Sequence, residues 1–487
     1  MDYAKTDKNN MIFPKKGGQD CEAILSRCHM QISQQDKTRV LEAIRKGKID
    51  AADVSFPNLI DAIVLKMKQE GMLELLEKSI TDKRADNNNI PFKVLLTLAI
   101  VAKMKIKSSL TDIPYAITDA GTLSEIGWNI WDNERGLKDG LMDEGAIRNM
   151  VKKYSAEEWI AGYNNYVQEK VYVKMGIETD IHILDCSELE VVLGNENYEK
   201  STVVKDDDGV RRGYKLSTLR GLYEDSGIIE EIRLGDIKTH DLELSREMVM
   251  NSKVLKAGDI LINDRGFISR ELINYLKTER GVDTYVPLKS NMIAYKEAIG
   301  IAMREGEWQD HPNKKRKQKI CFVESIGCFW ESENIENDVE MNACVVYDYI
   351  NYECFVFVCT DQHKTAKQII KTYELRPEIE EDYRQIKDFW KIEDFKSTKY
   401  SFISFHIVMV LMGYLFFQLY RCMECGQHLA GKSLPVALKK YTQEGPKSVI
   451  VYAGQYFGIF SFLEFIQLYA SVGVDIQALL NPILGKV

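Results

Sequence analysis

The stretch Ile181-His182-Ile183-Leu184-Asp185 marks the point where the pattern of the chain changes. Before it, apolar residues recur at helical spacing, whereas after it short apolar runs alternate with turn residues. Further strands are expected at residues 215–223 and 228–234, and the run Asp206-Asp207-Asp208-Gly209 indicates a turn before them. The stretch is therefore expected to be the first strand of a sheet.

Helix and strand alternate beyond these three strands. Residues 241–255 form a predicted helix, 259–263 a buried strand, 270–277 a helix and 284–288 a strand. Three strands followed by this alternation predict an α/β fold with a mixed sheet.

The rest of the chain divides by composition and period. Residues 92–106 are a strongly apolar helical stretch, and the basic run Lys314-Lys315-Arg316-Lys317 lies in a β-rich segment. One long helix is expected from Thr365 to Trp390. A length of 487 residues suits two or three domains. The predicted division is a flexible arm at 1–36, a helical N-terminal domain at 37–175, a mixed-sheet domain at 176–290 and 360–425, a β-rich inserted subdomain at 291–359 and a helical C-terminal region at 426–487.

The composition is that of an ordered globular protein, with 45% hydrophobic and 28% charged residues. The net charge is -9, so no positive field of the whole molecule attracts nucleic acid. Any contact with nucleic acid is therefore expected at local basic patches.

Cysteine content and the N-terminal residues favour the cytoplasm. Ten cysteines make no disulfide framework, and residues 1–16 lack the apolar core of a signal peptide. Residues 400–420 contain no Asp, Glu, Lys or Arg and are long enough to span a bilayer. A buried core helix is the preferred interpretation, because residues such as Ser404 and Gln418 dilute the run and a large domain needs a central helix.

Three acids stand where a mixed sheet can bring them together. Asp185 and Asp264 each end a predicted strand, and Glu380 lies in the long helix. Carboxylates at the ends of neighbouring strands project from one sheet edge, and a helix packed across that edge supplies a third. Such hard oxygen ligands bind Mg²⁺ and leave positions open for water and phosphate. The alternative for each Asp alone is a turn-forming role.

The helix supplies a more specific pattern. Tyr373, Arg376, Glu380 and Lys387 fit the spacing Tyr-x2-Arg-x3-Glu-x6-Lys and share one broad helix face. A carboxylate on that face suits a metal ion, and the flanking cations suit phosphates. The alternative is a solvated helix with charge pairs. Pro377 indicates that the regular helix begins there.

These four residues resemble the signature of DDE transposases of bacterial insertion sequences, in the group named for Tyr-Arg-Glu-Lys. The block Asn263-Asp264-Arg265-Gly266-Phe267 is similar to the second acidic block of that group, and Leu184-Asp185-Cys186-Ser187 fits the first block less well. Gly213-Tyr214-Lys215 and His240-Asp241 also stand where the family tends to have similar residues. The resemblance covers about residues 180 to 425.

The resemblance implies an RNase H-like catalytic domain in which Asp185, Asp264 and Glu380 are the catalytic and metal-binding residues. The expected cofactor is Mg²⁺, with Mn²⁺ as a substitute. Two such ions activate the attacking oxygen and stabilise the leaving one in phosphoryl transfer. Tyr373 and Arg376, together with Lys387, are then expected to position DNA.

The implied activity is cut-and-paste transposition, in which double-stranded DNA is cleaved at inverted repeats that bound an element and is joined to target DNA. The N-terminal domain is assigned to DNA-end binding by its position alone. A homodimer is expected on DNA, with the C-terminal region as the candidate for dimerisation, and no membrane partner is expected. Two other functions stay open: a domesticated DNA-binding protein on the same fold, and a structure-specific nuclease that cuts without joining.

The inserted segment holds two candidates for DNA contact. The basic run at 314–317 would neutralise phosphates, with a solvated loop as the alternative. Trp308 and Trp330 are candidates to stack on an unpaired base, because the resemblance implies hairpin or flipped-base chemistry in some members. The alternative for each Trp is a core position.

Two other patterns are weaker. Cys422, Cys425 and His428 have part of a zinc spacing without a second pair, so inert thiols are expected. The acidic run at 206–208 has a cation site as one interpretation, but a hairpin turn is preferred.

Overall fold

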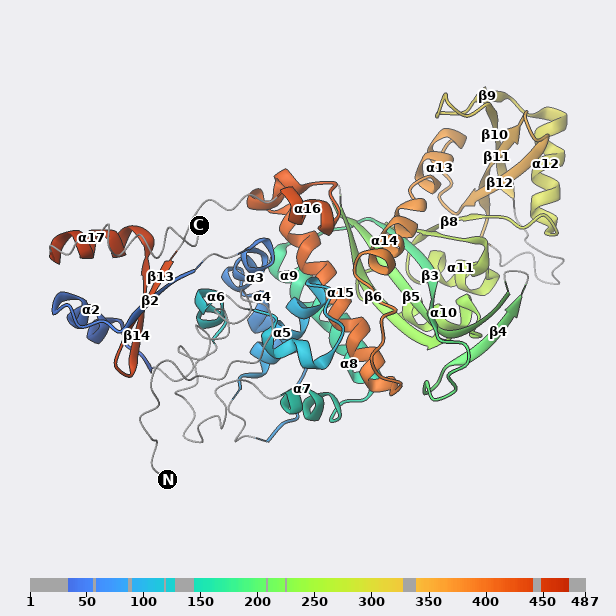
Figure 1. Ribbon diagram of the computed structural model, residues 1–487. Coiled ribbons are helices and arrows are strands. Elements are labelled where there is room, and N and C mark those ends of the chain that lie inside the picture. Colours follow the sequence, from blue (N-terminus) through green and yellow to red (C-terminus); the bar gives the residue numbers. More distant parts are fainter. Residues whose placement is uncertain are drawn as a thin grey trace. The chain divides into compact units, whose positions relative to one another are not determined.

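A computed structural model describes the greater part of the chain, namely residues 34–55, 58–85, 90–117, 120–127, 144–206, 209–223, 226–326, 339–440 and 448–472. Contacts within the chain divide it into two compact units, whose elements are labelled in Figure 1. The first unit comprises residues 1–74, 82–150 and 436–487, and the second comprises residues 75–81 and 151–435.

The second unit is built on a ten-stranded sheet. Its strands follow the order β4-β5-β3-β7-β8-β12-β11-β10-β9, and β6 pairs with β5 off this path. The strands are β3 (Ile181–Val191), β4 (Thr202–Asp206), β5 (Gly209–Tyr223), β6 (Ser226–Asp236), β7 (Ile260–Asn263), β8 (Asp283–Pro287), β9 (Trp308–Asp310), β10 (Gln318–Ile326), β11 (Met341–Asp348) and β12 (Glu353–Cys359).

The directions of the central strands make the sheet mixed. β3 is antiparallel to β5, and β5 is antiparallel to β6. β3 is parallel to β7, and β7 is parallel to β8. The α/β class with a mixed sheet, predicted from the sequence, is confirmed.

Helices cover both faces of the central strands. Ile183 and Ile262 pack in a buried cluster with residues of two helices, whereas Leu184 and Leu261 pack in another cluster with residues of two more. Successive residues of a strand point to opposite faces, so a strand buried on both sides must be apolar throughout. The helices of the first cluster are α13 (Ala366–Tyr373) and α14 (Pro377–Asp388), and those of the second are α10 (Asp241–Asn251) and α11 (Arg270–Thr278).

The β-rich segment continues the same sheet. β12 pairs antiparallel with β8, with Val358 opposite Val286, and β11, β10 and β9 follow outward. Helix α12 (Ile293–Glu305) packs against β10, β11 and β12. The strands of the predicted inserted subdomain therefore share backbone hydrogen bonds with the central sheet.

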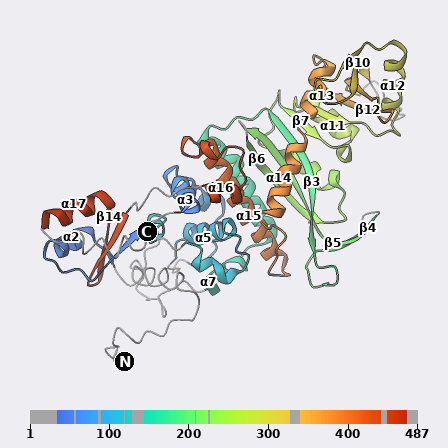
Figure 2. The ribbon, with the colours of Figure 1, turned by 45° about the horizontal axis from the view of Figure 1, so that its top comes forward.

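The helix predicted from Thr365 to Trp390 is two helices. α13 ends at Tyr373, and α14 begins at Pro377, which is its first residue. Proline has no amide hydrogen to donate to the preceding turn, but it suits the first turn of a new helix. The predicted start at Pro377 is confirmed, and the single long helix is corrected. Figure 2 shows α14 beside β3 and β6, both of which it contacts.

The longest apolar helix lies in the interior of the structure. α15 (Tyr400–Cys422) packs against β6, α14 and α8 (Ala156–Asn165). It is the one helix among the described residues that is long and apolar enough to cross a membrane, yet 94% of its most apolar window is buried. This burial favours the predicted core helix over a membrane span.

The first unit contains a second sheet, with the strand order β1-β14-β13-β2. Its strands are β1 (Gln34–Gln35), β2 (Ala51–Ser55), β13 (Ser448–Ala453) and β14 (Tyr456–Ser461), and α2 (Lys37–Arg45) packs on β13 and β14. Val40 and Ile44 of α2 meet Val449 and Val451 in its core. The other α-helices among the described residues are α3 (Leu59–Gln69), α4 (Met72–Ser79), α5 (Phe92–Met104), α6 (Ala120–Glu125), α7 (Glu144–Val151), α9 (Tyr172–Met175), α16 (Leu434–Lys440) and α17 (Phe462–Val472).

This second sheet corrects two predictions of helix. Residues 448–461 form a hairpin where a helical C-terminal region was expected, and β2 interrupts the helices predicted at 37–175. The β-branched run Val449-Ile450-Val451 and the turn at Gly454 suit a hairpin. The domain boundaries predicted from the sequence stay predictions.

Candidate functional site

Asp264 directly follows β7, as predicted, whereas Asp185 lies within β3 and does not end it, because β3 stays paired with β5 as far as Val191. Leu184 of β3 is paired with Asn263 of β7, and Asp185 and Asp264 come directly after this pair. Both carboxylates accept a hydrogen bond from a following amide, at 2.9 Å from the nitrogen of Cys186 and at 2.6 Å from that of Arg265. The strand register therefore brings the two acids to the same edge of the sheet.

Helix α14 brings the third acid and an arginine to that edge. The Arg376 guanidinium lies 2.9 Å from Asp185 and 3.6 Å from Asp264, and it also pairs with Glu380. Only 16% of the Arg376 side chain is exposed, against 38% for Asp264 and 55% for Glu380. Three carboxylates from three elements thus converge on one cation at a partly open site.

Burial and charge shift the titration of this cluster. Burial raises the pKa of Asp185 to about 6; Arg376 opposes the shift, and the negative charges of Asp264 and Glu380 add to it. Burial alone would lower the pKa of Arg376, but the three carboxylates outweigh it and raise the pKa. The guanidinium therefore stays charged and neutralises part of the acidic cluster.

The donor atoms of the cluster suit a hard divalent cation, because all three acids present carboxylate oxygens. Among the residues that the structure describes, no three Asp, Glu, His or Cys side chains lie close enough together to hold one ion. Arg376 stands among the three carboxylates and supplies the positive charge there. The donor atoms therefore fit a hard divalent cation by their type, but in this structure they are arranged around Arg376.

Of the other two signature residues, Tyr373 lies beside the cluster, and Lys387 makes its contacts farther along β3. The ring of Tyr373 lies 4.7 Å from that of Phe357, and burial, followed by the charge of Asp264, raises the pKa of its hydroxyl. The Lys387 ammonium donates to the backbone oxygen of Glu188 at 2.6 Å and lies 3.5 Å from Glu393. Lys387 thus ties the end of α14 to β3.

A lysine and an aspartate support the loop that carries Asp264. Lys215 of β5 donates to Asp241 at 2.7 Å, and a Cβ atom at Gly266 would lie 3.3 Å from the same carboxylate. These residues belong to the short blocks that the family resemblance also singled out. The pair therefore joins β5 and α10 beside the end of β7.

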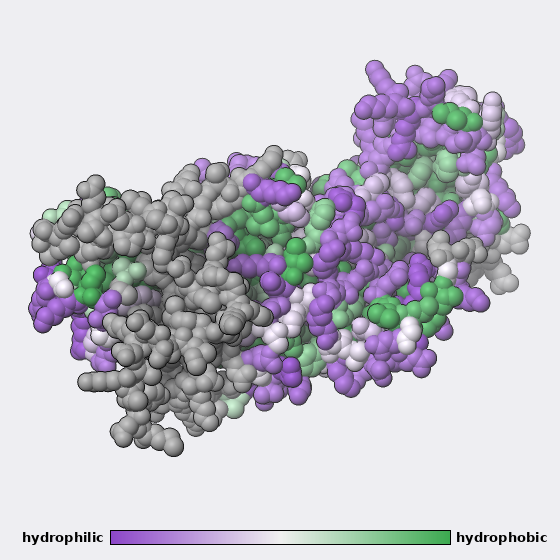
Figure 3. Space-filling model, in the orientation of Figure 1, coloured by the Kyte–Doolittle hydropathy of each residue, from purple (hydrophilic) through white to green (hydrophobic). Residues whose placement is uncertain are grey.

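The basic run lies between β9 and β10. Lys314, Lys315 and Lys317 are exposed, whereas Arg316 lies 3.2 Å from Glu374, which stands between Tyr373 and Arg376 in the chain. This ion pair places the basic run beside the signature segment. Figure 3 shows a largely hydrophilic surface over this part of the molecule, with small hydrophobic areas.

The two tryptophan candidates have different outcomes. Trp308 of β9 is partly buried against the core under α12, and its ring stands edge-on to Tyr347 at 6.1 Å. This packing favours the core alternative for Trp308. Trp330 lies outside the described residues.

Sequence reasoning missed an aromatic turn beside the basic run. Tyr349 and Tyr352, in the turn between β11 and β12, are 45% and 79% exposed. Register places this turn next to the basic run, because Gln318 is paired with Asp348. Tyr352 has φ of +58°, which a bulky residue rarely adopts. The sequence signal was two tyrosines in a short connection between predicted strands.

A second charged cluster is centred on His182 of β3, which stands three residues before Asp185 in the sequence. His182 contacts Glu230 at 2.7 Å through Nδ1 and Asp259 at 3.3 Å through Nε2. The side chains of His182 and Glu230 have no exposed surface, and Tyr172 and Thr179 also donate to Glu230. This cluster is closed to solvent and fully partnered.

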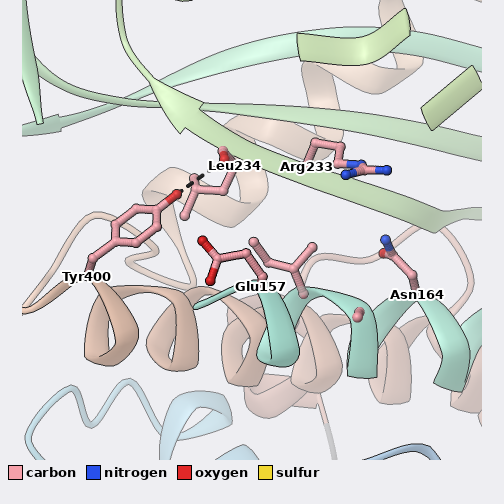
Figure 4. A pocket seen from close by; sticks show the side chains of 7 residues that line it. Glu157, Asn164, Arg233, Leu234 and Tyr400 are labelled. Carbon is pink, nitrogen blue, oxygen red and sulfur yellow. Dashed lines mark hydrogen bonds between the residues drawn. The ribbon is translucent and has the colours of Figure 1, made fainter. Parts of the chain in front are cut away.

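The two weaker sequence patterns, at residues 422–428 and 206–208, form no binding site among the described residues. Cys422, Cys425 and His428 are not among any metal-binding group in the described part of the chain. Asp206 ends β4 opposite Gly209, as a hairpin requires, while Asp207 and Asp208 lie outside the described residues. A pocket of about 190 Å³ between α8, β6 and the start of α15 contains none of the predicted site residues (Figure 4).

One known protein family matches the part of the chain that contains two of the three acids. Residues 205–416 match the family model described as a transposase DDE domain. No curated protein matches the chain. The matched region includes Asp264, Arg376 and Glu380 and starts after Asp185. The match indicates a DNA-cleaving and DNA-transposing enzyme, in agreement with the predicted class, a DDE transposase.

Proposed function

We propose that this protein is a cut-and-paste transposase of an insertion sequence, in the group with the Tyr-Arg-Glu-Lys signature. The observation that carries the proposal is the convergence of Asp185, Asp264 and Glu380 on Arg376. A protein that only binds DNA has no need of three carboxylates at a phosphate site, because they repel the backbone. Metal-dependent phosphoryl transfer does need them.

The catalytic unit is assigned an RNase H-like fold. The assignment is supported by the strand order β6-β5-β3-β7-β8, in which the first three strands are antiparallel and the last three are parallel. Its acids stand within β3, directly after the neighbouring strand β7, and on helix α14.

Asp185, Asp264 and Glu380 are the proposed catalytic residues and would hold two Mg²⁺ ions, with Mn²⁺ as a substitute. Bound metal would supply Lewis-acid stabilisation of the charge that develops in phosphoryl transfer. Arg376 keeps the three carboxylates together in the protein without DNA. Its planar guanidinium is also suited to a bidentate grip on a DNA phosphate. Tyr373 lies beside it, and Lys387 is proposed to meet DNA farther along α14.

The path of DNA is proposed to run from this site over the basic run. Arg316 is paired with Glu374 beside the signature, so Lys314, Lys315 and Lys317 are the cations free to meet further phosphates. Tyr349 and Tyr352 stand at the neighbouring turn and, with Trp330, are the aromatic candidates for base contact. Phosphate contacts of this kind make affinity fall with salt.

The remaining assignments are also proposals. The helical N-terminal region would bind element ends, and the C-terminal region would join two copies on paired ends. The partners are then double-stranded inverted repeats and target DNA, in the cytoplasm at the nucleoid. The burial of α15 supports a protein that works without a membrane.

The test uses DNA ends taken from the inverted repeats expected on either side of the gene. The purified protein is incubated with paired ends, a supercoiled target and Mg²⁺ or Mn²⁺, and both nicked ends and joined products are measured. Joined products are the expected result. Nicking without joining would favour the structure-specific nuclease, and binding without nicking would favour the domesticated DNA-binding protein.

A further inference from the structure

The face of α14 that meets the sheet is partly polar. Its buried residues are Ile379, Asp382, Tyr383 and Ile386. Asp382 is only 5% exposed, although an isolated carboxylate in an apolar interior is strongly disfavoured. The helix that carries Glu380 and follows Arg376 therefore rests on the sheet through specific polar contacts as well as apolar ones.

Asp382 is held from two sides. Arg220 of β5, 4% exposed, donates from its Nε to one oxygen of Asp382, and the hydroxyl of Tyr414 in α15 donates to the other at 2.6 Å. Arg220 also lies 3.1 Å from Glu378, one helical turn before Asp382. Two successive turns of α14 are thus fixed to a single guanidinium.

The surrounding strands are shaped for this arginine. A Cβ atom at Gly227 of β6 would lie 2.2 Å from the Nε of Arg220, so only glycine leaves room for the guanidinium. The pairing of β5 with β6 skips Glu230, so the extra residue at this point belongs to β6. The space for Arg220 is therefore built into the sheet at Gly227.

The next residue of α14 contacts the main chain of a proposed catalytic acid. Tyr383 donates to the backbone oxygen of Asp185 at 2.8 Å, and its hydroxyl lies 2.5 Å from that of Thr218. Since Asp382 and Tyr383 are adjacent, a shift of the helix that breaks one contact also breaks the other. The position of α14 along the sheet thus decides how Glu380 and Arg376 stand relative to Asp185.

We propose that Arg220 and Asp382 are positioning residues, whose buried ion pair fixes the register of α14 and so assembles the three acids. The proposal rests on the proposed function of those acids. A buried ion pair contributes little net stability compared with apolar residues of similar volume, but its directional bonds select one geometry. An apolar contact would hold the same helix without fixing its position along the sheet.

The decisive variant replaces the three buried polar members of the network and leaves Glu378, whose side chain is 42% exposed. Arg220→Met, Asp382→Leu and Tyr414→Phe together leave no buried polar group without a partner, so the thermal midpoint is expected to stay near that of the wild type. Mn²⁺ affinity, measured by electron paramagnetic resonance of the free ion, is expected to fall roughly 10-fold to 100-fold. Nicking is expected to fall about 100-fold, because small misplacements of reacting groups have effects of that size.

Controls separate positioning from a general effect on the helix. Glu381→Ala and Arg384→Ala remove an exposed ion pair of the same helix that does not touch the sheet, and both are expected to bind Mn²⁺ like the wild type. Arg220→Lys keeps the charge without the fork of donors and is expected to recover part of the affinity. Amide exchange in α14 should remain slow in the apolar variant, because the helix stays docked.

The outcomes are distinct. A folded apolar variant that binds Mn²⁺ and nicks like the wild type would overturn this proposal alone. A wild-type protein that neither binds Mn²⁺ nor nicks would overturn the proposed function, and this inference with it. If the apolar variant does not fold, Asp382→Asn, which keeps the shape of the side chain, decides by the same two measurements: wild-type Mn²⁺ affinity would refute the ion pair, and a fall of about 10-fold would support it.

Discussion

Strand β3 contributes to two acidic clusters that differ above all in their exposure to solvent. At Asp185 three carboxylates surround an arginine, and Glu380 and Asp264 remain open to solvent. At His182 two carboxylates surround an imidazole, and nothing of His182 or Glu230 is exposed. The two clusters therefore differ in access, because the cluster at Asp185 is partly open to solvent and the one at His182 is buried.

The largest expected effect lies in the open cluster. Asp185→Ala, Asp264→Ala and Glu380→Ala are each expected to lower nicking and joining by about 10³-fold or more, because the residues act as a unit. The triple variant should be scarcely worse than any single one. Binding to end DNA should survive, since each change removes negative charge from a phosphate site. Robust nicking by a well-folded Glu380→Ala protein would remove Glu380 from the assignment.

The closed cluster is expected to respond in stability. His182→Gln leaves Glu230 and Asp259 facing one another in the interior without a cation, so the free energy of unfolding is expected to fall by about 3 to 5 kcal/mol. Denaturant titration measures the loss. Nicking per folded molecule should remain close to that of the wild type. If His182→Gln instead lost most of its nicking and kept its stability, the cluster at His182 would share the catalytic role proposed for the cluster at Asp185.

The closed cluster also predicts a pH dependence. Burial opposes protonation of His182, but Glu230 and Asp259 outweigh it and raise the pKa to about 10. A pKa raised above the unfolded value of about 6.5 gives stability that is complete below that value and is lost as pH rises through 10. The difference in unfolding free energy between wild type and His182→Gln should therefore shrink from pH 7 to pH 10. The hydroxyl of Tyr172 in α9 also contacts this cluster, through Glu230. The pH dependence of the unfolding free energy of Tyr172→Phe therefore serves as the comparison.

The smallest effects come from a matched pair of glycines. A Cβ atom at Gly221 would lie 2.2 Å from a carboxylate oxygen of Glu230 in the closed cluster, so Gly221→Ala is expected to cost about 1 to 3 kcal/mol. A Cβ atom at Gly266, beside Asp264, meets only Asp241, at 3.3 Å. Gly266→Ala should therefore change stability by less than about 0.5 kcal/mol. Thermal unfolding of both variants makes the comparison, and equal losses would contradict it.

Local pattern was enough for the elements that hold the acids. Apolar runs predicted β7 and the start of β3, and the residues after these runs gave Asp264 and Asp185. The continuation of β3 to Val191 was missed, because its residues beyond Asp185 are largely polar and are held by pairing with β5. Pro377 marked the start of α14 for a local reason, the missing amide hydrogen. The short break between α13 and α14 was hidden, because Glu374 and Leu375 suit a helix in sequence terms.

Long-range pairing was beyond the reach of the same reasoning. Arg220 and Asp382 stand 162 residues apart, and the sequence around neither residue predicts that the two form a pair. The hairpin at 448–461 is completed by β2, near the other end of the chain, so its strands were predicted as helix. Such contacts depend on which elements pack together in the complete fold. The local pattern of a single sequence does not contain this information.

The continuity of the large sheet has a consequence for where DNA is cut. β12 is hydrogen-bonded to β8, and β8 to β7, whose end carries Asp264. The basic run, between β9 and β10, belongs to the same hydrogen-bonded plate. In the proposed function the continuous sheet fixes the distance between the lysines that bind DNA and the acids that cut it. The cut is then expected a fixed number of base pairs from the lysine contacts. Lengthening a loop elsewhere would leave the cut in place, whereas a slipped strand between β8 and β9 would move it.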